Sequence, residues 1–188
     1  MTISFLRASA RQGYTTLGVS VDGETKKYTV PDRAVATLFR GYELDPLEYE
    51  EIVRLDEERR AQDKAASLLS ASDKSRSTLR MRLSSLGFSR ESAEGAVEEC
   101  VRLGYLNEER QLRRLISREA LVSLRGPKYI VRKLASKGYA ISDIRRIISE
   151  LTESGEIDFS DSFARLAEKR GATDPESLRA LAYKYGYK

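Results

Sequence analysis

The sequence has no histidine and no tryptophan among its 188 residues, and its one cysteine is Cys100. Without histidine, the chain lacks the side chain that most often serves as a general base near neutral pH and as a zinc ligand. A lone cysteine forms neither an intrachain disulfide nor a cysteine-rich metal site, and the apolar spacing around Cys100 indicates an inert core residue. We therefore expect a protein that is not an enzyme and that holds no cofactor or metal.

Long hydrophobic runs are also missing. No stretch approaches the length of apolar residues that a membrane span requires. The segment Met1–Leu6 lacks the charged start and long apolar run of a signal peptide, so we expect a cytoplasmic protein with no membrane partner. Neither the phosphate-loop pattern nor the dinucleotide glycine fingerprint occurs, which argues against a nucleotide site.

Acidic side chains are scarce in one part of the chain. Residues 110–150 carry 11 basic and 3 acidic side chains, a net charge of +8, whereas the whole chain has a net charge of +4. Arginine outnumbers lysine in this stretch by 8 to 3, and arginine binds phosphate and carboxylate as a bidentate fork. The imbalance predicts an anionic partner, but it does not distinguish nucleic acid from an acidic protein surface.

A sequence pattern returns at long intervals. Apolar helical stretches end in a glycine followed by an aromatic residue at Gly87-Phe88, Gly138-Tyr139 and Gly186-Tyr187, and these glycines are 51 and 48 residues apart. A period of this length indicates tandem helical modules that bury their faces against neighbours. We expect each glycine to adopt the left-handed conformation that closes a helix, with the aromatic side chain folding back onto it.

The apolar spacing predicts a mainly α fold with tandem three-helix repeats in an elongated, curved array, preceded by a small N-terminal β-hairpin and helix module. The expected parts are the N-terminal module over residues 1–60, a first repeat over 61–107, a basic second repeat over 108–158 and a truncated third repeat over 159–188, which lacks its last helix.

The N-terminal module contains the only strand signals. Alternating apolar residues over 17–21 and 28–30 flank Asp22-Gly23, which favours a tight hairpin turn, and Ile3 and Phe5 supply a third strand. The segment from Pro31 to about Phe39 is predicted to form a short helix.

A longer helix is expected to begin at Asp45-Pro46, with Asp at the cap and Pro in the first turn. The charge-dense stretch over residues 56–60 is either a continuation of this helix or a hinge. We favour the helix, because no glycine or proline follows until Gly87.

The candidate binding residues lie in the basic second repeat. Arg125-Gly126-Pro127-Lys128 reads as a turn that opens a helix, and a helix N-terminus flanked by cations attracts anions through both dipole and charge. Within this turn, Arg125 and Lys128 are the pair that we expect to act jointly. The full set predicted to contact an anionic partner is Arg110, Arg113, Arg114, Arg118, Arg125, Lys128, Arg132 and Lys133.

Three segments resemble the RecX family of bacterial regulatory proteins. The first combines Ser77, Leu79 and Leu83 with Gly87-Phe88, and the second is Leu103-Gly104-Tyr105-Leu106-Asn107-Glu108-Glu109-Arg110. The third, Arg125-Gly126-Pro127-Lys128 followed by Ile130, Leu134 and Gly138, is similar to the most recognisable segment of the family. The resemblance covers about residues 61–188. One departure is Gln111-Leu112, where the family has Phe-Ala or Tyr-Ala.

The resemblance implies a regulator that binds the filament of the RecA recombinase on single-stranded DNA. Such proteins lie in the groove of the filament or cap its growing end, and they inhibit ATP hydrolysis, strand exchange and stimulated repressor cleavage. A role in DNA repair by homologous recombination and in the SOS response follows from the same resemblance. The eight cations named above would then make the contacts to RecA or DNA, and we expect the regulator to be a monomer.

Two alternatives remain open from the residues alone. Three-helix modules with a basic helix resemble helix-turn-helix units, so the chain could bind single- or double-stranded DNA autonomously, with an affinity that falls steeply with salt. A helical adaptor for another acidic protein is the third interpretation.

Overall fold

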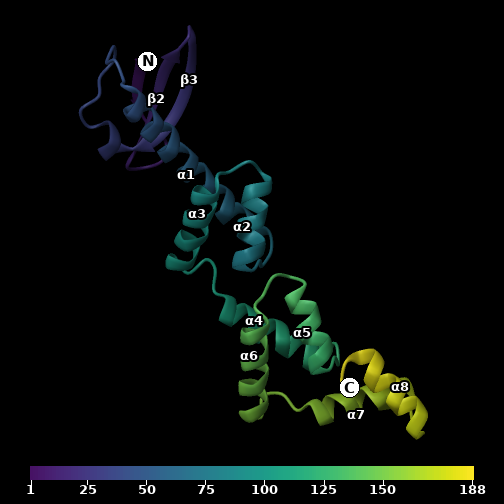
Figure 1. Cartoon of the computed structure of the whole chain (residues 1–188). Coiled ribbons are helices and arrows are strands. Elements are labelled where there is room, and N and C mark those ends of the chain that lie inside the picture. Colours follow the sequence, from purple (N-terminus) through teal and green to yellow (C-terminus); the bar gives the residue numbers. More distant parts are fainter. The chain divides into compact units, whose positions relative to one another are not determined.

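The computed structural model describes all 188 residues, Met1–Lys188, and contains eight α-helices and one three-stranded sheet. The predicted fold class, mainly α with a small N-terminal β module, is confirmed (Figure 1). The chain forms two compact units, which we describe separately: Met1–Ser70 with Arg80–Leu103, and Ala71–Leu79 with Gly104–Lys188. No helix is both long enough and apolar enough to cross a membrane.

The first unit begins with an antiparallel sheet in the order β1 (Thr2–Ala8), β2 (Tyr14–Val21), β3 (Glu24–Pro31). Val21 pairs with Glu24 across the predicted turn, and the φ angles of Asp22 (51°) and Gly23 (83°) are both positive, as a two-residue type I′ hairpin requires. The predicted hairpin and third strand are therefore confirmed.

The helix predicted over Pro31–Phe39 is wrong in its extent. Only one 3₁₀ turn forms, η1 (Asp32–Val35), and no side chain caps its N-terminus. The following backbone bonds to β1 instead, because the amide of Gly41 donates to the carbonyl of Ile3 (2.8 Å) and the amide of Leu44 donates to that of Met1 (2.8 Å). Pairing with the sheet thus competes successfully with helix propagation.

Helix α1 (Pro46–Ala71) runs without interruption through the charge-dense stretch, so the continuous helix is confirmed. The carboxylate of Asp45 accepts from the amide of Glu48 (2.8 Å), and the Glu48 carboxylate accepts from the amide of Asp45 (2.9 Å), which is a reciprocal capping box. The boundary predicted at residue 60 lies inside this helix.

A buried carboxylate ties α1 to the sheet. Asp56 accepts hydrogen bonds from the backbone amide of Thr29 on β3 (2.9 Å) and from the guanidinium groups of Arg59 and Arg60 (2.9 Å each). The apolar residues of the sheet pack against the same helix through Ile52. Helices α2 (Arg76–Ser85) and α3 (Arg90–Arg102) follow, and the buried face of α3 includes Cys100, as predicted.

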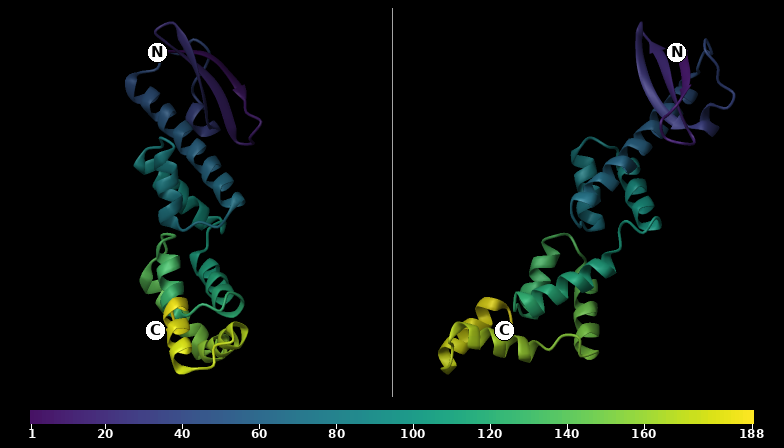
Figure 2. Two further views of the ribbon diagram at one scale, coloured as in Figure 1. Left: turned by 90° about the vertical axis from the view of Figure 1, so that its right-hand side faces the viewer. Right: turned by 180° about the vertical axis from the view of Figure 1, so that it is seen from behind.

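The second unit is built around α4 (Glu108–Ser117), a π-helical turn η2 (Arg118–Val122), α5 (Pro127–Ala135) and α6 (Ile141–Glu153). One apolar core joins these elements, and its fully buried side chains include Ile116, Ile130, Leu134, Ile144 and Ile147. Helices α7 (Phe159–Arg170) and α8 (Pro175–Tyr185) form the final pair, drawn in yellow-green and yellow in Figure 2.

The three Gly-aromatic sequences close their helices as predicted. Gly87, Gly138 and Gly186 have φ angles of 92°, 82° and 83°. After each glycine, the amide of the aromatic residue donates to a carbonyl five positions earlier, at distances of 3.3, 3.3 and 2.8 Å. This pattern is the Schellman motif, which satisfies carbonyls that a helix end leaves unpaired.

Two of these glycine turns, those at Gly138 and Gly186, also contact the start of another helix. The carbonyl of Lys137, next to Gly138, accepts from the hydroxyls of Ser75 (2.9 Å) and Thr78 (2.8 Å) at the N-terminus of α2. A Cβ atom added to Gly138 would lie 2.7 Å from the Ser75 hydroxyl oxygen, so glycine is required by the close approach as well as by the positive φ.

The same contact recurs one repeat later. The carbonyl of Tyr185 accepts from the amide of Gly126 (2.9 Å), and the carbonyl of Gly186 accepts from the amide of Lys128 (3.0 Å) at the N-terminus of α5. Ser75 and Gly126 are 51 residues apart, and Lys137 and Tyr185 are 48 apart, so the sequence period reproduces one contact twice. We call this contact, a glycine turn seated on the first turn of a helix, the turn-to-helix joint.

Replacing Gly126 by alanine should disrupt the second joint. The added Cβ would lie 2.4 Å from the backbone carbonyl of Gly186, and overpacking against backbone costs about 1–3 kcal/mol. We expect Gly126→Ala to lower the urea midpoint and to speed amide exchange in α8. Gly95→Ala, in the middle of α3 with open space around its Cβ, is the matched control and should be neutral or stabilising. Equal urea midpoints of the two variants would contradict the claim that the turn-to-helix joint at Gly126 stabilises the protein.

Candidate anion-binding surface

The structure places the eight predicted cations on four neighbouring segments of the second unit: α4, η2, the turn before α5, and α5 itself. The eight cations fall into two groups, according to whether they form a salt bridge within the protein. Arg113, Arg114, Arg118 and Lys133 make salt bridges inside the protein, whereas Arg110, Arg125, Lys128 and Arg132 make none. The cations of the second group are those whose charge is available to a ligand.

Two arginines of α4 are bound to acidic residues of other helices or loops. Arg113 forms a salt bridge with Glu150 of α6 and lies 3.6 Å from Glu109, and Arg114 forms a salt bridge with Asp73. These pairs join α4 to segments far away in sequence. The charges of Arg113 and Arg114 are therefore neutralised within the protein. The spacing of arginines along one helix face does not by itself tell which of them are free to bind a ligand.

A buried carboxylate neutralises Lys133. Glu119, on η2, has a side chain that is only 3% exposed, and it accepts a hydrogen bond from the Lys133 ammonium at 2.8 Å. Arg118 lies 3.6 Å from the same carboxylate. A buried carboxylate without a partner is destabilising, so the role of Lys133 is to stabilise the fold by pairing with Glu119.

Arg125 is held between two aromatic rings. Its guanidinium carbon lies 4.4 Å from the ring centroids of both Tyr129 on α5 and Tyr185 on α8. Cation–π contacts on both faces fix the side chain, and they connect the start of α5 to the end of the chain. Arg125 therefore stabilises the second joint while keeping a charge with no carboxylate partner.

The helix N-terminus expected to bind an anion is occupied. Pro127 has no amide, and the amide of Lys128 already donates to the carbonyl of Gly186. The dipole at this end of α5 thus attracts a backbone carbonyl of the same chain, and the amide of Lys128 already has an acceptor there.

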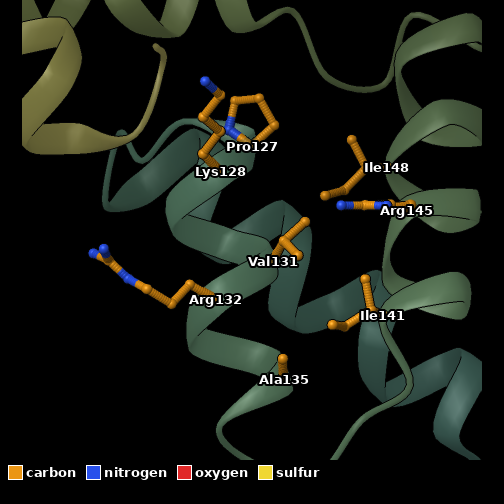
Figure 3. Close-up of a pocket in the computed structure, with 8 residues that line it drawn as sticks. All are labelled: Pro127, Lys128, Val131, Arg132, Ala135, Ile141, Arg145 and Ile148. Atoms are coloured by element: carbon orange, nitrogen blue, oxygen red, sulfur yellow. The ribbon is translucent and has the colours of Figure 1, made fainter.

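The free cations of α5 gather around a groove with α6. The groove has a volume of about 630 Å³, and Lys128 and Arg132 line it together with Arg145 from α6 (Figure 3). Its remaining lining is aliphatic: Pro127, Val131, Ala135, Ile141 and Ile148. The side chain of Arg145 extends toward α5 between those of Ile141 and Ile148, while that of Arg132 points away from α6.

Arg145 was absent from the predicted set. It makes no salt bridge, unlike its neighbour Arg146, which pairs with Glu150 at 2.7 Å. The sequence did contain a signal, since Ile141, Arg145 and Ile148 are spaced by four and three residues and so share a helix face beside the buried stripe of Ile144 and Ile147.

One tyrosine beside this surface has an unpaired hydroxyl. The Tyr187 hydroxyl is buried without a hydrogen-bond partner, and its ring contacts that of Phe163 with a centroid distance of 4.9 Å. Burial raises the pKa of Tyr187 from 10.0 to about 12, with a smaller opposing effect of Arg125.

Comparisons with known proteins agree with this architecture. Over 153 residues, 80% of this chain, the sequence is 29% identical to the regulatory protein RecX of Lactobacillus delbrueckii subsp. bulgaricus, and the match covers 55% of that protein. It is also 29% identical to the regulatory protein RecX of Lactobacillus gasseri over 133 residues, 70% of this chain and 49% of that protein. The chain therefore spans about half the length of the curated relatives it matches. No family model matches it.

A solved structure shares the fold. A crystal structure of regulatory protein RecX superposes with a TM-score of 0.71, covering 99% of this chain and 92% of that chain at 19% identity. The chain is thus similar in sequence to curated proteins named regulatory protein RecX and shares the fold of a solved RecX structure. The resemblance drawn from the sequence motifs is confirmed.

Removing the amine of Lys133 should destabilise the protein. Lys133→Met leaves the buried Glu119 carboxylate without its ammonium donor, and losing a charged hydrogen bond costs about 2–3 kcal/mol. The double variant Glu119→Gln with Lys133→Met should regain much of that loss, because no buried charge is then left unpaired. Urea unfolding measures both, and a double variant as unstable as the single one would argue against this pair.

Replacing Tyr187 by phenylalanine should not destabilise the protein at pH 7, because the buried hydroxyl has no partner to lose. The alkaline response should change. The folded state holds the Tyr187 proton more tightly than the unfolded state, so its contribution to stability is full below pH 10 and is lost between pH 10 and about 12. Tyr187→Phe should reduce the loss of stability over this range in pH-dependent thermal melts. Tyr183→Phe, at a side chain that is 80% exposed, should behave as the parent.

Proposed function

We propose that this chain is a regulator that binds the filament of the RecA recombinase on single-stranded DNA and inhibits its ATPase, its strand exchange and its coprotease activity in the cytoplasm. The relatives that match it are named regulatory proteins. Because the chain spans about half of their length, its partner and activity are inferences from this similarity and from its own surface.

The observation that carries the proposal is the set of unopposed cations in the second unit. Arg110, Lys128, Arg132 and Arg145 are exposed and make no salt bridge, although 29 carboxylate side chains are present in the chain. A nucleoprotein filament presents both phosphates and protein carboxylates, which are the groups that arginine and lysine bind with charge-assisted hydrogen bonds.

The four internally paired cations have a supporting part in this proposal. Arg113, Arg114, Arg118 and Lys133 would fix the positions of α4, η2 and α5, and the free cations on these elements would make the contacts. Arg125 is in both classes, since the tyrosine rings hold it in place and leave its charge without a carboxylate.

The experiment is a titration of the DNA-stimulated ATPase of the cognate RecA at fixed salt. We expect inhibition by the parent protein at less than one regulator per recombinase. Lys128→Glu with Arg132→Glu should abolish or strongly weaken inhibition, by charge repulsion of an anionic partner. The matched control is Arg179→Glu with Lys184→Glu, an equal change in charge at exposed, unpaired residues of α8, and it should inhibit as the parent does.

The same preparations separate the alternatives. If Lys128→Glu with Arg132→Glu left the inhibition unchanged, these free cations would not be the contacts to the filament. A protein that leaves the ATPase unchanged but binds bare DNA with a steep salt dependence would instead be an autonomous DNA-binding protein.

A further inference from the structure

The groove between α5 and α6 combines two chemical features that together restrict its occupant. Its floor is aliphatic, formed by Val131, Ala135, Ile141 and Ile148, and its rim carries three cations with no salt bridge. Ile141 is 48% exposed, so apolar surface is open to solvent there. A cleft of about 630 Å³ is within the range of about 300–1,000 Å³ that is typical of binding clefts.

The aliphatic floor argues against nucleic acid as the occupant. Proteins that bind single strands stack the bases on aromatic side chains, and no aromatic residue lines this groove. The phosphates of a nucleic acid could pair with the three cations, but they would leave the aliphatic floor exposed to water. A protein segment with apolar side chains would cover the floor.

The charge of the rim selects among protein segments. Arg145 extends from α6 into the groove, and Lys128 lines it from the first turn of α5, whereas Arg132 lines it with its stem and its guanidinium points away from α6. All three are exposed and none has a carboxylate of its own chain as partner, so acidic side chains of an occupant would add opposite charge without displacing an existing pair. A basic or neutral segment would leave the positive charge of these side chains without an opposite charge.

We propose that the groove between α5 and α6 binds an acidic helical segment of a partner protein, with aliphatic side chains of that segment on the floor and its carboxylates at Arg145 and Lys128. Laying the apolar stripe of an amphipathic helix into a groove between two helices is a recurrent mode of recognition. The inference deepens the proposed function, because it gives the chemistry of the protein segment that this surface recognises.

The experiment measures the binding of labelled synthetic peptides to the full chain by fluorescence anisotropy, without RecA and without DNA. The probe is a glutamate-rich helical peptide with two leucines one helical turn apart. One control peptide replaces both leucines by serine, and a second replaces the glutamates by glutamine. We expect the probe to bind and each control peptide to bind at least about tenfold more weakly, a factor that corresponds to about 1.4 kcal/mol.

Variants of the protein locate the binding. Arg145→Ala removes the charge that lies within the groove, and Ile141→Ser removes apolar surface from its floor. Each should weaken binding of the probe about tenfold or more. Arg146→Ala is the matched control for charge, as the next residue of α6 and outside the lining, and Val122→Ser is the control for an exposed apolar side chain. Both should bind the probe as the parent does.

Ile141→Ser and Arg145→Ala are expected to remain folded because both positions are exposed, and circular dichroism and thermal melting are the checks. Binding of the probe that neither variant changes would overturn the proposal. So would a thymidine oligonucleotide that loses affinity for both variants while the probe keeps its affinity, because nucleic acid would then be the occupant. Failure of the peptide assay with ATPase inhibition retained would reject the groove and leave the proposed function standing.

Discussion

The second unit depends on one repeated contact, in which the glycine turn that ends one helix is seated on the first turn of another. The contact needs a positive φ, which the glycine supplies, and it needs space for two backbones to meet, which only glycine leaves. At α2 the carbonyl of Lys137 finds two hydroxyls, and at α5 the carbonyls of Tyr185 and Gly186 find two amides. At α5, backbone groups that two helix ends leave unpaired therefore satisfy each other, whereas at α2 side-chain hydroxyls satisfy the carbonyl.

The joint at α5 explains why the most recognisable segment of the sequence is not simply an anion site. Gly126 fits against the closing turn of α8, and Arg125 stacks between Tyr129 and Tyr185. The segment first positions α5. Positioning α5 in turn places Lys128 and Arg132 at the groove, so this segment can contribute to binding through the helix that it fixes.

The strong positive charge of residues 110–150 has two structural roles. Some of these cations pair with carboxylates that lie elsewhere in the fold: Asp73, Glu109 and Glu150 on the surface, and Glu119 in the interior. The remainder have no such partner and stay open to solvent. A net charge counted along the sequence includes both groups, whereas only the second group can attract a partner without breaking an internal pair.

The sequence by itself determined the fold class, the hairpin at Asp22-Gly23, the continuous α1 and the glycine closures, because these features follow from local turn chemistry and apolar periodicity. It did not determine that the segment after Pro31 bonds to β1, nor that Arg114 reaches Asp73, since these contacts join residues far apart along the chain. The spacing of Ile141, Arg145 and Ile148 marks one face of a helix, but only the tertiary structure brought Arg145 into one groove with Lys128 and Arg132, because a groove arises where two helices pack.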